Sequence, residues 1–252
     1  MAKSLRFVHT SDLHLDALQG SDDAHATNRR RLIRDAFACV LETTRNVDAD
    51  ALLIAGDLFD SNRATPETIA WFAQQCATIA PTPVIAINGN HDALGPASVY
   101  RQKDLFDVAN LHLVLDTPGR TVTIDGLDLV IWGRAFAESD WEFKPLDGLP
   151  PRTDDRWHVA LAHGHYVREA QDHHRSMLIW PSEIVSSGWD YFALGHWEPH
   201  ADVTTDGVPA IYSGAPMPIS DANTQAGYVV VVDCDSVSGV SWRQVNVDPR
   251  RD

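Results

Sequence analysis

Hydrophobic and polar positions in the first hundred residues form short apolar runs separated by helical patterns. Residues 28–46 place apolar side chains along one helical face. A second helix is expected from Thr65, an N-cap residue followed by proline, to about residue 80. Three apolar runs have the length and composition of buried strands: 6–9, 51–55 and 83–87. This alternation of strands and helices predicts a layered α/β arrangement.

Short strand patterns dominate the rest of the chain. Asp125-Gly126 and Asp206-Gly207 separate neighbouring patterns, and such dipeptides are typical of hairpin turns. One short helix is expected at 181–187. Strands are expected at 111–115, 121–124, 127–131, 158–162, 191–194, 209–212, 228–232 and 240–247. Because the sequence shows no repeat, low-complexity stretch or linker, we expect residues 1–252 to form one domain.

Composition and charge restrict the choice of partners. Hydrophobic residues make up 44% of the chain, and its formal net charge is −15. Such a charge argues against a broad, sequence-independent grip on nucleic acid, which needs Lys and Arg to neutralise phosphates. It does not exclude a nuclease, because carboxylates that hold metal ions are offset by those ions. For the basic cluster at Arg29, Arg30, Arg31 and Arg34, a solvated helix face is favoured over contact with a phosphate backbone.

Apolar runs and cysteines indicate the cellular setting. No apolar run reaches about 18 residues, so no transmembrane helix or membrane partner is expected. The N-terminus lacks the features of a secretory signal. Cys39, Cys76 and Cys234 are isolated and lack metal-binding spacing, so we expect reduced thiols in a cytoplasmic protein.

Metal-capable side chains recur where the predicted strands end. Loops at the carboxyl ends of strands converge at one edge of an α/β sheet. One polar residue there would mean little, but five such strand ends predict a metal site. Imidazole and carboxylate ligands without cysteine favour manganese, iron or zinc over calcium. Two such ions can share one carboxylate, lower the pKa of a shared water and neutralise charge on a phosphoryl group.

The motifs resemble those of the calcineurin-like metallophosphoesterases in order and context. They are Asp12-x-His14, Gly56-Asp57-x-x-Asp60, Gly89-Asn90-His91-Asp92, His163 and Gly195-His196. Segments 8–16, 55–60 and 212–216 further resemble the DNA double-strand-break repair exonuclease branch, without its capping domain. The resemblance covers nearly the whole chain. It implies a four-layer αββα sandwich of two mixed β-sheets flanked by helices, and phosphodiester hydrolysis by a metal-bound hydroxide.

The resemblance also implies a role for each metal-capable residue. Two divalent ions, with manganese preferred and iron or zinc as alternatives, would lie on either side of Asp57. The first ion would be held by Asp12 and His14. The second would be held by Asn90, His163 and His196.

Two further residues match the family's catalytic positions. His91 would contact the phosphate and help the leaving group depart. Asp60 would orient His91, because an imidazole with a carboxylate partner stays cationic to higher pH and can donate a proton.

One position departs from the family pattern Gly-His-x-His, whose last histidine completes the first metal site. That position is Glu198 here, and His200 follows two residues later. Glu198 can replace the histidine as a carboxylate ligand, His200 can reach the ion, or the first site can fill only with substrate. We favour Glu198 as the ligand.

Three functions remain open at this stage. A DNA repair nuclease follows from the branch resemblance, whereas the acidic composition favours a phosphodiesterase or phosphatase acting on a small molecule or nucleotide. A non-catalytic metal-binding scaffold is the third. The partners we expect are a phosphoester substrate, with nucleic acid as one candidate, and a protein partner or a second copy of the chain.

Overall fold

The structure is a computed structural model in which two six-stranded sheets form the centre of the molecule. It describes residues 4–18, 20–21, 23–105, 107–138, 140, 142–169, 174–219 and 223–251. The α-helices are α1 (Ala24–Asn46), α2 (Pro66–Ala77) and α3 (Pro181–Ser187). Two 3₁₀ turns follow β3: η1 (Val99–Arg101) and η2 (Lys103–Leu105).

The first sheet has the order β14-β13-β1-β2-β3-β4. Its strands are β1 (Leu5–Thr10), β2 (Ala51–Ala55), β3 (Val84–Ile87), β4 (Leu111–Leu113), β13 (Tyr228–Asp235) and β14 (Gly239–Asn246). β1 to β4 run parallel to one another, whereas β13 pairs antiparallel with both β1 and β14. The carboxyl ends of β1, β2 and β3 therefore lie at the same edge of the sheet.

The second sheet has the order β11-β12-β10-β7-β6-β5. Its strands are β5 (Arg120–Thr123), β6 (Leu129–Gly133), β7 (Trp157–His163), β10 (Tyr191–Gly195), β11 (Ala201–Asp202) and β12 (Ala210–Tyr212). β6, β7, β10 and β12 are parallel, and β5 and β11 are antiparallel edge strands. A separate ribbon pairs β8 (His165–Tyr166) with β9 (Leu178–Ile179).

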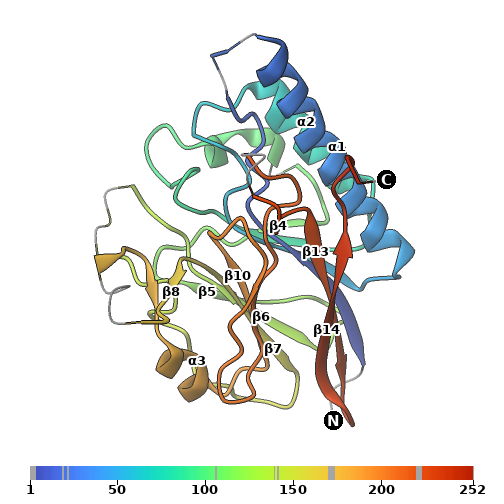
Figure 1. The fold of residues 1–252 in the computed structure, drawn as a ribbon. Coiled ribbons are helices and arrows are strands. Elements are labelled where there is room, and N and C mark those ends of the chain that lie inside the picture. The colour runs from blue at the N-terminus through green and yellow to red at the C-terminus, as the bar shows by residue number, and fades with distance from the viewer. Residues whose placement is uncertain are drawn as a thin grey trace.

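The two sheets pack face to face, and helices cover their outer faces (Figure 1). α1 and α2 bury Ile33, Phe37 and Phe72 against the first sheet. Apolar residues of both sheets, such as Phe7 and Leu161, form the layer between them. On the far side, Ile184 of α3 packs against the second sheet. The predicted sandwich of two mixed sheets flanked by helices is thus confirmed.

Local signals explain the starts of two helices and one hairpin turn. Thr65 caps α2 by accepting a hydrogen bond from the Thr68 N–H, as expected. α1 begins four residues earlier than predicted, because Asp23 accepts a hydrogen bond from the Ala26 N–H and supplies the cap. Asp206 and Gly207 both have positive φ, 48° and 83°, as a tight hairpin turn requires.

Arg29 differs from the expectation of a solvated helix face. Its side chain is buried and donates to the carbonyl oxygen of Pro218 at 2.9 Å. Arg31 does follow the expectation, since it is exposed and pairs with Asp35 one helical turn away. Among the described residues, no helix combines the length and apolar character needed to cross a membrane.

Candidate metal centre

Five strand ends bring the predicted site residues together at one edge of the sandwich. β1 leads into Asp12 and His14, and β2 leads into Asp57. These two loops run side by side, because the Asp12 N–H donates to the Gly56 carbonyl at 3.0 Å and the His14 N–H donates to the Asp57 carbonyl at 3.1 Å. Asn90 and His91 follow β3, His163 is the last residue of β7, and His196 follows β10.

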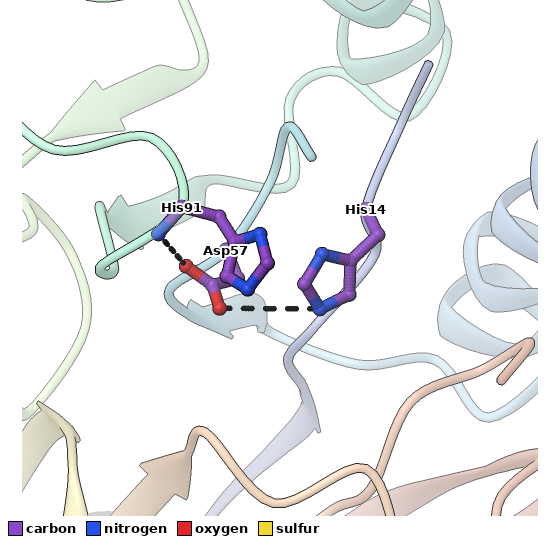
Figure 2. Close-up of side chains that lie close together, drawn as sticks. All are labelled: His14, Asp57 and His91. Atoms are coloured by element: carbon purple, nitrogen blue, oxygen red, sulfur yellow. Dashed lines mark hydrogen bonds and ion pairs between the residues drawn. The ribbon is translucent and has the colours of Figure 1, made fainter. Parts of the chain in front are cut away.

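Asp57 lies at the centre of this group. Its Oδ2 is 3.9 Å from His14 Nε2 and 3.2 Å from His163 Nε2, and its Oδ1 accepts the His91 backbone N–H at 2.9 Å. Figure 2 shows one carboxylate oxygen joined to the His91 backbone nitrogen and the other to the His14 ring. Two metal-capable clusters share it: Asp57 with His14 and His91, and Asp57 with Asp12 and His163. In each cluster the ligand atoms lie within 4.8 Å of one another.

Asn90 connects the two histidines that end β7 and β10. Its Oδ1 lies 3.1 Å from His163 Nε2 and 3.1 Å from His196 Nδ1. The other ring nitrogen of His163 donates to the Ala55 carbonyl at 2.9 Å, so Nε2 is the nitrogen that faces the site. One amide oxygen and two imidazoles therefore converge beside Asp57.

The backbone at these positions is held in uncommon conformations. Asp12, His14 and Asp57 have φ of 55°, 48° and 50°, and His196 has φ of 102°. Left-handed backbone at a residue other than glycine costs of the order of 1–3 kcal/mol and clusters at functional sites. The surrounding loops thus impose the directions of the side chains.

Three glycines give the ligands room. A methyl group on Gly89 would overlap the Asp57 carboxylate, and one on Gly56 would overlap the His163 ring. At Gly195 it would strike the Ala55 carbonyl. The ligands therefore pack directly against backbone that carries no side chain.

Burial and mutual charge shift the pKa values of the group strongly. Burial alone would lower the pKa of His14, but the hydrogen bond with Asp60 and the charges of Asp57 and Asp12 raise it to about 9. For His163, burial is again outweighed, chiefly by Asp57, and the pKa rises to about 9. His196 goes the other way, because burial and the nearby His163 lower its pKa to about 3. The carboxylates therefore favour positive charge on His14 and His163.

Asp60 contacts both His14 and His91, through different atoms. Its carboxylate oxygen is 3.3 Å from His14 Nδ1 and 3.9 Å from His91 Nδ1. The Asp60 backbone carbonyl accepts a hydrogen bond from His91 Nδ1 at 3.0 Å. His91 is thus oriented mainly by the carbonyl, and its Nε2 is the nitrogen left to face a substrate. The His91 side chain is 43% exposed, far more than those of the other clustered ligands.

Comparison with known proteins identifies the family. The family model described as "Calcineurin-like phosphoesterase" matches residues 5–198, a span that contains every predicted site residue. The chain belongs to the calcineurin-like phosphoesterase family. It is therefore a member of a hydrolase family that acts on phosphoester bonds.

Curated relatives of this phosphoesterase include archaeal repair proteins. It is 26% identical over 230 residues to "DNA double-strand break repair protein Mre11" of Methanopyrus kandleri, covering 86% of the chain and 49% of the relative. The Haloferax volcanii protein of the same description is 30% identical, with 83% and 45% covered. "Uncharacterized metallophosphoesterase YhaO" of Bacillus subtilis is 26% identical, with 91% and 55% covered. The phosphoesterase thus spans about half the length of these relatives, and its single-domain assignment stays a prediction.

A solved structure supports the fold. The protein TT1561 of Thermus thermophilus superposes with a TM-score of 0.62 at 12% identity, covering 97% of this phosphoesterase and 100% of that chain. At this identity the likeness concerns the arrangement of the sheets and helices alone.

Glu198, the position that departs from the family pattern, lies outside both metal-capable clusters. Its Oε1 accepts the Ile219 N–H at 3.4 Å, and its Oε2 accepts the Asn223 side-chain amide at 3.2 Å. His200 was the alternative ligand, and its ring centroid lies 5.5 Å from that of Trp242. The assignment of Glu198 as a ligand stays a prediction.

Asp92 contributes more than the isolated turn carboxylate that a polar loop suggests. It is fully buried and accepts the backbone N–H groups of Leu58, Phe59 and Gly89 together with the Tyr100 hydroxyl. One carboxylate thereby ties the loop of Asp57 to the loop of Asn90. Its position two residues after Asn90 could have suggested a role in the site. Sequence alone, however, does not distinguish a buried turn from an exposed one.

The donor set fits a pair of divalent ions. Imidazole nitrogens, carboxylate oxygens and one amide oxygen converge, without a thiolate, on both sides of Asp57. Such ligands suit manganese, iron and zinc. Around Asp57, His14 is grouped with His91 and Asp12 with His163, whereas Asn90 Oδ1 lies 3.1 Å from ring nitrogens of both His163 and His196. The division of these residues between a first and a second ion stays a prediction.

Proposed function

We propose that this chain hydrolyses phosphodiester bonds with two divalent ions held on either side of Asp57. The observation that carries the proposal is the shared carboxylate, which belongs to both metal-capable clusters. Two ions held there would acidify a water molecule and neutralise the charge that develops on the phosphoryl oxygens. Manganese is the proposed metal, with iron and zinc as alternatives.

The protein's own residues position the substrate and the proton. His91 is the exposed member of the group, so its Nε2 contacts the phosphate and assists the leaving oxygen. The Asp57 carboxylate accepts the His91 backbone N–H. The Asp60 backbone carbonyl accepts a hydrogen bond from His91 Nδ1 and so orients the ring. General acid assistance of this kind contributes about 10²–10⁴-fold to rate.

Nucleic acid is the substrate class we propose first, because two relatives are named as DNA double-strand break repair proteins. The net charge of −15 supports a second candidate, a small-molecule or nucleotide phosphodiesterase, since few cations are available to neutralise a polyanion. On α1, Arg31 is engaged with Asp35, and Arg34 donates to Thr68. A non-catalytic scaffold ranks third, because it would have no use for an exposed His91 beside the shared carboxylate.

A substrate panel separates the three functions. Wild type, His91→Ala and His25→Ala are incubated with Mn²⁺ and either bis(p-nitrophenyl) phosphate or single- and double-stranded oligonucleotides. His25 lies on the exposed first turn of α1 and controls for the loss of one histidine. Metal analysis of His91→Ala shows whether both ions are still bound.

Each outcome decides between the candidates. Degradation of oligonucleotides that falls at least about 100-fold in His91→Ala alone supports the nuclease. Turnover of the small diester without oligonucleotide cleavage supports the second candidate. No turnover with Mn²⁺, Fe²⁺ or Zn²⁺ refutes the enzyme and leaves the scaffold.

The cellular location and the partners are also proposals. We propose a cytoplasmic protein, because its three cysteines are free thiols in the structure. A protein partner or a second copy of the chain is proposed as well.

A further inference from the structure

Segment 212–216, one of the segments that resemble the repair exonuclease branch, begins at a tyrosine beside the candidate metal centre. Tyr212 ends β12, next to β10, and its side chain is fully buried. Its hydroxyl donates to the Gly164 carbonyl at 2.7 Å and accepts the Tyr166 N–H at 2.8 Å. One phenol therefore holds both ends of the turn that immediately follows His163.

Trp197 ties the neighbouring loop to the same turn. It follows His196 directly, and its Nε1–H donates to His165 Nδ1 at 3.0 Å. The indole also stacks on the Tyr212 ring, with centroids 4.3 Å apart and planes 10° apart. The Arg168 guanidinium also lies over the indole, 4.8 Å from its ring centroid. The indole is therefore held by a hydrogen bond, by a stacked ring and by a guanidinium.

These contacts act on the two histidines that converge on Asn90. His163 ends β7, and His196 directly follows the adjacent parallel strand β10. Each places a ring nitrogen 3.1 Å from Asn90 Oδ1. The backbone of His196 has φ of 102°, a conformation that needs external support. Tyr212 anchors the loop after His163, and Trp197 anchors the loop after His196 to that same turn.

We propose that Tyr212 and Trp197, with His165 as the acceptor that joins them to the turn, are positioning residues for the second metal site. They would set the separation of His163 and His196 without touching the ion. This inference rests on the proposed two-metal function and adds residues that lie outside its ligand set. Partners that orient metal ligands typically change metal affinity by about 10–100-fold when they are removed.

The test measures the affinity of each ion rather than turnover. Mn²⁺ is titrated by calorimetry into metal-free wild type, Tyr212→Phe and Trp197→Phe, and electron paramagnetic resonance records the signal of the coupled ion pair. Asn90→Ala identifies which binding event belongs to the second site. Tyr191→Phe is the matched control, because Tyr191 is equally buried on the neighbouring β10 but its hydroxyl lies against His9.

We expect Tyr212→Phe and Trp197→Phe to weaken the second ion about 10-fold, to leave the first unchanged and to reduce the coupled-pair signal at limiting Mn²⁺. Tyr191→Phe should keep both affinities. If both variants lower the unfolding temperature in EDTA but bind both ions as wild type does, the two aromatics support only the fold and the inference is overturned. If wild type binds no pair of ions, the proposed function fails first.

Discussion

His9 should make the stability of this protein fall in acid. Its side chain is completely buried between the sheets, and Nδ1 lies 3.1 Å from the Tyr191 hydroxyl. Burial, together with the nearby His200, lowers the pKa of His9 from 6.5 to about 3. The folded protein therefore keeps this imidazole neutral at pH values where the unfolded chain protonates it.

The sign and size of the effect follow from that difference. Above pH 6.5 neither state binds the proton, so the stabilising contribution of neutral His9 is fully present. Below pH 6.5 only the unfolded state binds it, until the pH reaches about 3. Well inside this window the free energy of unfolding drops by about 1.4 kcal/mol per pH unit. Between pH 7 and pH 4.5 the loss due to His9 is about 2.5 kcal/mol.

Urea unfolding in EDTA at pH 7 and pH 4.5 measures this loss. His9→Asn keeps a polar group near the position of Nδ1 but cannot titrate, so its stability should fall by about 2.5 kcal/mol less than that of wild type. Tyr191→Phe removes the hydroxyl and keeps the imidazole, so the wild-type pH dependence should persist. Titration of other groups is common to the three proteins and cancels in the comparison. The same pH dependence in His9→Asn and wild type would refute the reasoning.

The remaining predictions concern the metal centre. Asp57→Asn removes the shared negative charge at nearly constant shape, so calorimetry should show both Mn²⁺ ions bound at least about 10-fold more weakly; loss of only one ion would contradict a bridging role. Asp60→Asn should weaken the ion beside His14 about 10-fold and spare the other, because its carboxylate lies 3.3 Å from His14 Nδ1. Glu198→Ala should lower occupancy of the first site more than the second, and metal analysis that finds two tightly held ions would defeat the ligand assignment.

Sequence patterns predicted most of the fold because the deciding signals are local. The continuous apolar run of β2 and the Thr65-Pro66 start of α2 each act within a few residues. The convergence of strand ends was also predictable, since parallel strands place their carboxyl ends together. Asp57 and Asn90 could therefore be expected near each other before any distance was known.

Contacts between distant segments were not predictable in the same way. Arg29 is buried because it reaches the Pro218 carbonyl, 189 residues away, and nothing in the helix itself indicates that acceptor. The preference of the Asp60 carboxylate for His14 over His91 depends on a few tenths of an ångström in loop geometry. Asp92 looks like any turn carboxylate until the loops that donate to it are assembled around it.

The glycines beside the ligands affect how mutational surveys of this protein should be interpreted. Gly56, Gly89 and Gly195 have no functional group, yet any larger residue there would displace Asp57, His163 or the Ala55 carbonyl. A saturation screen for activity would rank these three positions beside the ligands themselves. These three glycines would be intolerant to substitution because no space exists for a side chain. A screen that takes every intolerant position as a catalytic or metal-binding residue would therefore count three residues too many.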